Sequence, residues 1–269
     1  MKKKFVCVAP VSHNAEGRAA APEAVAREVI ECAKSGASMV HLHVRDEMGN
    51  QCFDLSHFRK TIDLIREESD IVIQGSTGGV CDLSLEERCV SLQDPRVQIA
   101  SLNMGSANVD EGVYINTKPD IRFWAKEMEK HNVCPEFEVF EAGMIQNVLD
   151  LAEEGFFRAH PYTFNLCLGF KGAMPATADA LYFMSRTLPK STHWGLSING
   201  FKNLSLHSAA IGMGADFVRV GFEDGMTVHN TGRDDNVAQV KAAVQLIKLA
   251  GHELASAQEV REDLHITKG

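Results

Sequence analysis

The feature that most constrains the fold is a regular alternation of short apolar runs with helical stretches. The runs occupy residues 5–12, 38–46, 71–77, 98–105, 135–141, 163–169, 192–200 and 216–224. Their starts lie 24 to 37 residues apart, so each gap holds one helix and two loops, which is the size of a βα unit. Eight such units in 269 residues predict an α/β fold, a (β/α)8 TIM barrel, with residues 1–269 forming a single domain.

Eight βα units can also open into a doubly wound sheet, but the GxGxxG turn typical of the dinucleotide-binding version is absent after the first run. The first helix is expected to begin at Pro22. The last one carries Val237, Val240 and Val244 at helical spacing and is expected to end at Gly251. The tail beyond it predicts a short amphipathic helix, which we interpret as a subunit contact.

Composition excludes several classes of partner. The formal net charge of −9 disfavours binding to nucleic acid. No apolar run reaches the roughly 18 residues that a membrane span needs. The N-terminal run 5–12 follows three lysines, but it lacks the cleavage pattern of a signal peptide, so we interpret it as a buried strand. Seven scattered cysteines without a CxxC motif indicate reduced thiols and a cytoplasmic protein.

Run 38–46 contains the sharpest functional signal. His41, His43 and Arg45 share one strand face, and two histidines at positions i and i+2 can reach one metal ion such as zinc. The alternative is a hydrogen-bonded pair of core histidines. Glu223, near the end of run 216–224, offers a third ligand, because the barrel brings this strand close to run 38–46. The alternative here is a capping carboxylate pair with Asp224.

Polar residues at other strand ends suit an anion. Run 71–77 ends in QGSTGG, where Ser76, Thr77 and Gly78 offer hydroxyls and free backbone N–H groups, although a tight glycine turn is the alternative. Ser106 follows run 98–105 and offers the same chemistry. Glu136 and Glu138 share one face of run 135–141, and we interpret them as interior ion-pair partners of Arg45 or Arg219.

These residues together resemble the β-keto acid cleavage enzymes, the family that includes the 3-keto-5-aminohexanoate cleavage enzyme. The matching motifs are HLHVRD (41–46), QGSTGG (74–79), EFEVFEAGM (136–144), LGFKGAMPAT (168–177) and RVGFED (219–224). The resemblance implies a (β/α)8 barrel that forms a homotetramer with one zinc ion per subunit. It also implies an exchange between two small molecules, in which a β-keto acid and acetyl-CoA give acetoacetate and a new acyl-CoA.

The resemblance also assigns roles around the metal. His41, His43 and Glu223 would be the zinc ligands. Arg219 and Asp224 would match the catalytic arginine and aspartate of the last motif. Because a carboxylate paired with an arginine ordinarily has a lowered pKa, we expect the pKa of Asp224 to be lowered.

The substrate contacts follow from the same motifs. Ser76 would match the serine that holds the substrate carboxylate, beside Thr77 and Gly78. The family threonine after strand four would fall at Ser106. Glu16 would match the acidic residue after strand one that selects the far end of the substrate. No phosphate-binding signature indicates where CoA binds.

Two other classes of metal enzyme, and a barrel without catalytic activity, are the alternatives. Amidohydrolases, which are hydrolases, carry HxH on strand one and further histidines on strands five and six, but PEFEVFE and TFNLCLG contain none. The zinc or manganese aldolase and lyase group carries HxH on strand seven, and THWGLSING lacks that pair. A barrel without catalytic activity does not explain polar strand faces that converge at one end.

Overall fold

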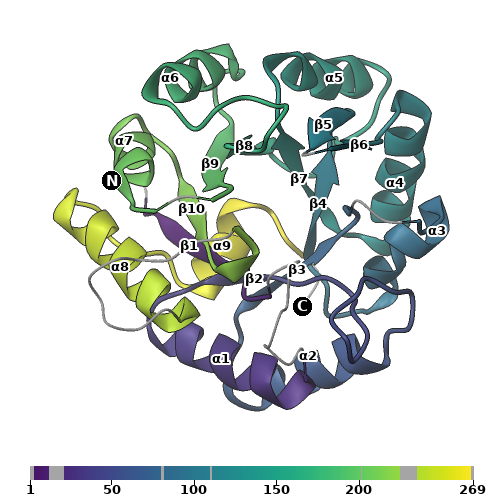
Figure 1. Ribbon diagram of the computed structural model, residues 1–269, viewed down its shortest axis with the longest axis vertical. Helices are drawn as coiled ribbons and strands as arrows, with labels where there is room; N and C mark the ends of the chain where they lie inside the picture. Colours follow the sequence, from purple (N-terminus) through teal and green to yellow (C-terminus); the bar gives the residue numbers. More distant parts are fainter. Residues whose placement is uncertain are drawn as a thin grey trace.

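A closed barrel of eight parallel strands forms the centre of the protein (Figure 1). The computed structural model describes residues 3–11, 21–79, 82–109, 111–200, 202–224 and 235–267. In order round the barrel the strands are β1 (Phe5–Val8), β2 (Met39–His41), β3 (Val72–Ser76), β4 (Ile99–Asn103), β7 (Cys134–Val139), β8 (Thr163–Leu168), β9 (His193–Ile198) and β10 (Phe217–Val220). β1 pairs with β10 to close the ring. The TIM-barrel prediction is confirmed, and each of the apolar runs overlaps one barrel strand.

Helices surround the barrel and cover the outer face of its strands (Figure 1). They are α1 (Pro22–Lys34), α2 (Ser56–Glu68), α4 (Lys118–His131), α5 (Ala142–Glu153), α6 (Ala178–Thr187), α7 (Ser205–Gly212) and α8 (Asn236–Leu249). Between β3 and β4 the helix is replaced by a short α3 (Leu85–Arg88) and a 3₁₀ helix, η1 (Val90–Gln93). As expected, Pro22 begins the first helix. α8 ends two residues before Gly251, which has a positive φ of 83°.

A small antiparallel hairpin follows β4 and was not predicted. Its strands are β5 (Ala107–Val109) and β6 (Gly112–Tyr114). The phenol of Tyr114 points back to the barrel, where its oxygen accepts a hydrogen bond from the side chain of Asn103. The hairpin therefore adds a side chain to the end of the barrel at which the strands finish.

Apolar side chains fill the end of the barrel where the strands begin. One cluster joins inward side chains of six strands to the C-terminal segment: Phe5, Cys7, Met39, Val72, Ile99, Cys134 and Phe217 pack with Ala255, Ala257, Val260, Leu264 and Ile266. This segment includes α9 (Ala257–Asp263), the helix expected after Gly251. Its apolar side is buried against its own barrel, and a subunit contact by this helix stays a prediction.

Two features bear on the predicted partners and location: the apolar character of the helices and the state of the cysteines. Among the described residues, no helix has both the length and the apolar character that crossing a membrane requires. The cysteines in this part of the chain are all free thiols: Cys7, Cys32, Cys52, Cys89, Cys134 and Cys167.

Candidate functional site

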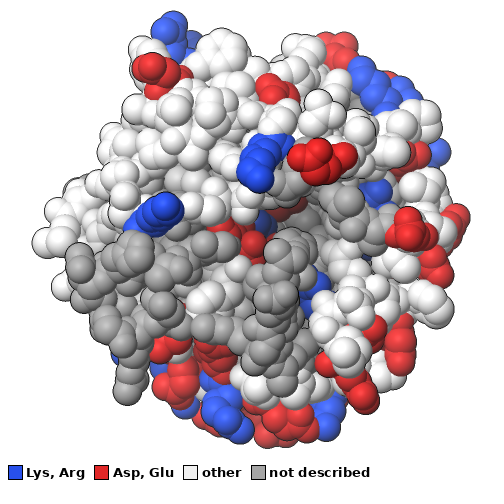
Figure 2. Space-filling model, viewed as in Figure 1, with Lys and Arg blue, Asp and Glu red and all other residues white. Residues whose placement is uncertain are grey.

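Charged side chains gather at the end of the barrel where the strands finish. In a (β/α)8 barrel this end carries the active site. Figure 2 shows acidic and basic atoms side by side around the hollow at the centre of the ring. The charged groups there are buried, which requires that they pair with each other or hold an ion. This end is therefore the candidate functional site.

Three potential metal ligands converge at this position. Nε2 of His41 lies 3.1 Å from Nε2 of His43, and Oε1 of Glu223 lies 3.4 Å and 3.3 Å from these two nitrogens. Within the described part of the chain, the potential ligand atoms of these three residues all lie within 4.8 Å of one another, close enough to hold one metal ion. His41, His43 and Glu223 thus lie together, as the sequence predicted.

The donor atoms fit the coordination of zinc. Two ligands at about 2.05 Å from a tetrahedral ion lie about 3.3 Å apart, and two imidazoles with one carboxylate form a familiar catalytic set. The observed separations of 3.1, 3.3 and 3.4 Å bracket that value. Three ligands also leave a coordination position for a substrate oxygen.

A glycine after β10 brings Glu223 and Asp224 to the same site. We expected a strand over 216–224, but β10 ends at Val220 and a 3₁₀ turn, η2 (Phe222–Asp224), follows. Gly221 has a φ of +139°, and a Cβ there would lie 2.2 Å from the carbonyl oxygen of Ala9, so only glycine fits. A continued strand would put the two adjacent carboxylates on opposite faces. The turn instead allows both to face the barrel axis.

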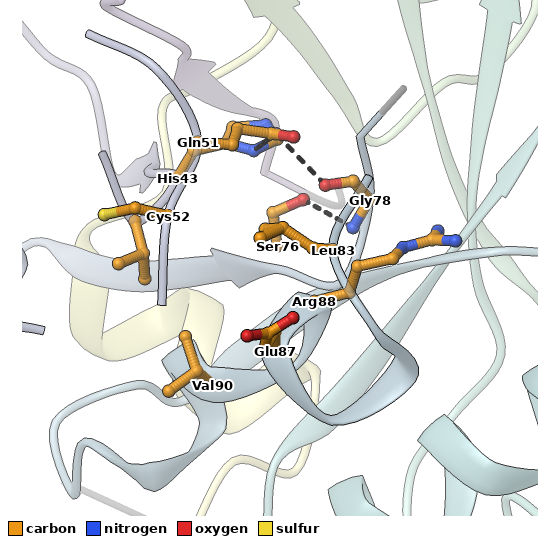
Figure 3. Close-up of a pocket in the computed structure, with 10 residues that line it drawn as sticks. His43, Gln51, Cys52, Ser76, Gly78, Leu83, Glu87, Arg88 and Val90 are labelled. Carbon is orange, nitrogen blue, oxygen red and sulfur yellow. Dashed lines mark hydrogen bonds between the residues drawn. The ribbon is translucent and has the colours of Figure 1, made fainter. Parts of the chain in front are cut away.

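Each histidine also has a partner on its other ring nitrogen. Nδ1 of His41 lies 2.8 Å from Oε1 of Gln74, which comes from β3 and is fully buried. Because an amide oxygen only accepts, Nδ1 carries the proton and Nε2 is free to bind a metal. Nδ1 of His43 lies 2.6 Å from Nε2 of Gln51. Figure 3 draws these two residues side by side at the pocket. Neither glutamine was singled out from the sequence.

Protonation in the cluster is set by burial and by the charge of Glu223. Burial lowers the pKa of His43 to about 3, which keeps this imidazole neutral. Burial also lowers the pKa of His41, but the Glu223 carboxylate outweighs it and the pKa is raised overall. Burial favours a neutral Glu223, yet the two histidines hold the pKa of its carboxyl well below the ordinary value. Glu223 is therefore a carboxylate, as a metal ligand must be.

Arg219 links two buried carboxylates beside the metal ligands. Its Nη2 and Nε donate to the two oxygens of Asp224 at 2.7 and 3.2 Å, and its Nη1 donates to Glu138 at 2.9 Å. The expected ion pair of Glu138 with Arg219 is confirmed, whereas the guanidinium of Arg45 donates to the carbonyl oxygen of Gly49.

The protonation of Asp224 differs from our expectation. Burial raises the pKa of Asp224 above 3.8, and this effect is larger than the lowering by Arg219. The sequence-based prediction of a lowered pKa was wrong, because it weighed the ion pair without the burial of the group. A carboxylate with a raised pKa is a stronger base, which suits a proton-transfer role.

The loop after β3 differs from the anion-binding turn that we expected. The N–H of Gly78 donates to Oγ of Ser76 at 2.9 Å, and the N–H of Gly79 donates to the phenol oxygen of Tyr114 at 2.8 Å. The hydroxyl of Thr77 donates to the carbonyl oxygen of Ser101 at 2.8 Å. These donors are already engaged within the chain. The hydroxyl of Ser76 is thus the main group of this loop that can donate to an anion.

Ser101, which was not among the predicted site residues, lies beside Ser76. Oγ of Ser101, on β4, lies 3.3 Å from Oγ of Ser76, and both serines are buried. Ser106 is exposed, and its hydroxyl accepts the N–H of Asn116. The signal for Ser101 was its place on the polar face of β4. Glu16 lies outside the described residues.

Arg88 and Tyr114 support this loop and were not predicted. Nε of Arg88 donates to the carbonyl oxygen of Thr77 at 3.1 Å, and its guanidinium lies over the rings of Trp124 and Tyr114, at 4.1 and 5.5 Å from their centroids. The phenol of Tyr114 accepts from Asn103 at 2.8 Å, and the same amide donates to Glu138 at 3.1 Å. A continuous network therefore joins the loop after β3 to the Arg219 ion pairs.

Comparisons with known proteins identify the family of this chain. A family model described as beta-keto acid cleavage enzyme matches residues 19–266. The 3-keto-5-aminohexanoate cleavage enzyme of Fusobacterium nucleatum subsp. nucleatum is 35% identical over 249 residues, covering 91% of this chain and 90% of the relative. The 3-dehydrocarnitine:acetyl-CoA trimethylamine transferase of Rhizobium meliloti is 30% identical over 271 residues, covering 92% and 89%.

Solved structures agree on the fold. The apo structure of ObcA superposes with a TM-score of 0.75 at 20% identity, and the match covers 91% of this chain and 64% of that one. A likeness at this identity supports the barrel alone. The family model covers nearly the whole chain, and the relatives match along most of their own length. The chain is therefore an enzyme that belongs to the β-keto acid cleavage enzyme family.

Proposed function

We propose that this protein is a zinc-dependent enzyme that exchanges the acyl group of a β-keto acid with acetyl-CoA. The keto acid R–CO–CH2–COO⁻ and acetyl-CoA would give R–CO–CoA and acetoacetate, so that one carbon–carbon bond forms and one breaks. The observation that carries this proposal is the convergence of His41, His43 and Glu223 beside the Arg219–Asp224 pair. The family and the names of its acetyl-CoA-using members support the same reaction class.

The metal ligands supply the first requirement of this chemistry. A proton next to a carbonyl is not acidic enough to leave at neutral pH unless the negative charge that develops on oxygen is stabilised. When bound, zinc supplies that stabilisation as a Lewis acid toward the keto oxygen. Two imidazoles, which are neutral when they ligate a metal, and one carboxylate would neutralise only part of its charge, so the ion with its three ligands would keep a net positive charge toward the substrate.

Asp224 is the residue that would accept the proton. Its carboxylate is buried, its pKa is raised, and both of its oxygens are held by Arg219. Arg219 would keep Asp224 in one orientation and offset the negative charge of the neighbouring Glu138 and Glu223. Nη2 of Arg219 lies 3.9 Å from Oε1 of Glu223, which connects the proton-transfer pair to the metal ligands.

The carboxylate of the keto acid would bind at the end of β3. Ser76 and Ser101 present two hydroxyls 3.3 Å apart, and a hydroxyl can donate one hydrogen bond to a carboxylate oxygen. Gly78 has to be a glycine here, because a Cβ would lie 2.3 Å from the phenol oxygen of Tyr114. Thr77 would support the loop through its hydrogen bond to Ser101, and Ser106 would hold the hairpin that carries Tyr114. Glu16 is proposed to contact the far end of the substrate.

Three further features belong to the same proposal. One zinc ion would bind per subunit, because each chain supplies a full set of three ligands. The assembly would be a homotetramer, as the family resemblance implies. The protein would act in the cytoplasm on small molecules, and its dispersed cysteines are free within the described part of the chain.

A labelling experiment tests the reaction. The zinc-loaded enzyme is incubated with acetyl-CoA labelled in its acetyl group and with a panel of β-keto acids that differ in R. We expect labelled acetoacetate and an unlabelled acyl-CoA that matches the R group of each substrate. Two controls accompany the assay: omission of the keto acid should give no product, and the Asp224→Asn variant should form product about 10²–10⁴-fold more slowly. Labelled acetate in place of acetoacetate would contradict the proposal, because it would indicate hydrolysis.

A further inference from the structure

Asn199 follows β9, on the far side of the barrel from the loop after β3. In the closed ring three strands separate β9 from β3 in either direction, so these two strands face each other across the barrel axis (Figure 1). The binding site proposed for the keto acid carboxylate uses Ser76 of β3 and Ser101 of β4. Asn199 therefore belongs to the wall opposite that carboxylate.

Three backbone contacts fix the position of Asn199. Its N–H donates to the carbonyl oxygen of Leu168 at 2.8 Å, which continues the ladder between β8 and β9 by one residue. The N–H of Gly200 donates to the carbonyl oxygen of Asp224 at 2.7 Å. A Cβ at Gly169 would lie 2.7 Å from the carbonyl oxygen of Asn199, so a glycine permits this close approach. The backbone at Asn199 is thus held beside the proposed base, Asp224.

The side chain of Asn199 belongs to the inner face of β9. Ser197, two residues earlier, is fully buried and donates to Sγ of Cys167 at 3.3 Å. Cys167 in turn shares a strand face with Asn165, whose amide donates to Glu136 inside the barrel. Because side chains alternate along a strand, Asn199 continues this face toward the open end. It is half-buried, and its amide makes no hydrogen bond with any residue that the structure describes.

A half-buried amide of this kind is suited to select a ligand. The side-chain oxygen of an asparagine accepts hydrogen bonds and its NH2 group donates two. When a ligand displaces water from such a group, the free energy cost is recovered only if the ligand supplies a hydrogen bond. A polar side chain in a binding site therefore discriminates against ligands that lack a partner for it. An uncharged amide matches a neutral polar group.

The proposed binding mode sends the R group of the keto acid toward this wall. The carboxylate would lie at Ser76, and the keto oxygen would face the metal ligands of β2 and of the turn after β10. In R–CO–CH2–COO⁻ the R group and the carboxylate extend from different sides of the keto carbon, so R points away from β3. The strand opposite β3 is β9, which leads to Asn199.

We propose that Asn199 is a specificity-determining residue that forms a hydrogen bond with a neutral polar group, such as a hydroxyl, on the R group of the keto acid. This inference rests on the proposed function, because it uses the carboxylate site at Ser76 to orient the substrate. It adds a second contact at the end of the substrate for which Glu16 is proposed.

Two substitutions test the amide. Asn199→Leu keeps the approximate size and removes both hydrogen-bonding functions. Asn199→Asp keeps the shape and an acceptor but replaces the NH2 group by a negative charge. Asn203→Asp is the matched control, because Asn203 is exposed and its Oδ1 accepts the N–H of Ser205 at 3.0 Å, a bond that aspartate also forms. Circular dichroism and zinc content establish that each variant is folded and loaded.

The primary measurement is the Kd of the zinc-loaded enzyme for two keto acids of the same shape, one ending in a hydroxyl and one in a methyl group. Calorimetry without acetyl-CoA gives both values independently of turnover, and their ratio cancels effects common to both acids. The wild type should prefer the hydroxyl acid. Asn199→Leu should reduce this preference by roughly 2- to 10-fold, the contribution of one neutral hydrogen bond.

The charged variant gives a second, independent shift. Asn199→Asp should strengthen binding of an acid that ends in an ammonium group, relative to the methyl acid, by roughly 10- to 150-fold, because a hydrogen bond to a charged group is stronger. Asn203→Asp adds the same charge outside the proposed contact and should leave the ranking of the acids unchanged.

The outcomes separate this inference from the proposed function. An unchanged preference in folded, zinc-loaded Asn199→Leu overturns the inference, and so do equal shifts in Asn199→Asp and Asn203→Asp. A higher KM for acetyl-CoA in Asn199→Leu, with the preference among keto acids intact, also overturns it, because the amide would then contact the thioester substrate. A wild type that shows the expected preference but forms no acetoacetate overturns the exchange reaction and leaves the role of Asn199 supported.

Discussion

Glu136 allows a quantitative test of how the barrel interior is built. This residue is 1% exposed, and Nδ2 of Asn165 donates to its Oε1 at 3.2 Å. Burial, with a further contribution from the charge of Glu138, raises the pKa of Glu136 from 4.5 to about 7. The folded protein therefore binds a proton at this position more tightly than the unfolded chain does.

The shift gives both the sign and the size of the effect. A carboxyl with a raised pKa in the folded state lowers the free energy of unfolding as pH rises from the unfolded pKa to the folded one. For Glu136 this window runs from 4.5 to about 7. One pKa unit corresponds to about 1.4 kcal/mol, so the full loss is about 3 kcal/mol. Above this window the loss stays constant.

The substitution Glu136→Gln removes the ionisation and keeps an oxygen for Asn165. The free energy of unfolding of this variant should not fall through ionisation at position 136. Relative to the wild type, the variant should therefore become more stable by up to about 3 kcal/mol as the pH rises from 4.5 to 7. Urea unfolding at a series of pH values, with the metal content of both proteins held equal, measures this gap, which is the difference in the free energy of unfolding between the variant and the wild type. Glu129→Gln on the exposed side of α4 is the control and should give a constant gap. A constant gap for Glu136→Gln would refute the reasoning.

Four further outcomes concern the site itself. Arg219→Met should lower the free energy of unfolding by about 3–5 kcal/mol in urea, because it leaves Glu138 and Asp224 as buried carboxylates without their arginine. Asp224→Asn should destabilise less, because Arg219 keeps Glu138, and it should reduce turnover by about 10²–10⁴-fold with zinc content unchanged; near-normal turnover would remove Asp224 from the mechanism. Ser76→Ala should reduce kcat/KM by roughly 10- to 150-fold, to a similar extent for all keto acids. Glu16→Ala should instead change the ranking of substrates, and the reverse pattern would mean that the substrate binds in the opposite direction.

The periodic features of the chain could be predicted from its sequence. Apolar runs at the spacing of βα units predicted each barrel strand, because burial on both faces demands such runs in a parallel sheet. The alternation of side chains along a strand placed His41 and His43 on one face. It also placed Glu136 and Glu138 of β7 inside the barrel, where Glu138 contacts Arg219.

The features that escaped prediction depend on contacts between distant segments. Ser101 was not chosen because only the tertiary structure shows its hydroxyl beside that of Ser76. The N–H groups of Gly78 and Gly79 were expected to be free, but their partners include a phenol from a hairpin that the periodicity did not reveal. The pKa of Asp224 was misjudged for the same reason, since burial cannot be read from an ion pair in the sequence.

The central claim is that bound zinc and acyl exchange belong to one site. The most direct measurement prepares metal-free enzyme, restores zinc in steps, and follows bound zinc and labelled acetoacetate in the same samples. The account predicts that product formation rises in proportion to bound zinc and levels off at about one ion per chain, and that His41→Ala neither retains zinc nor forms product. Full activity of an enzyme shown to contain no metal would contradict the claim.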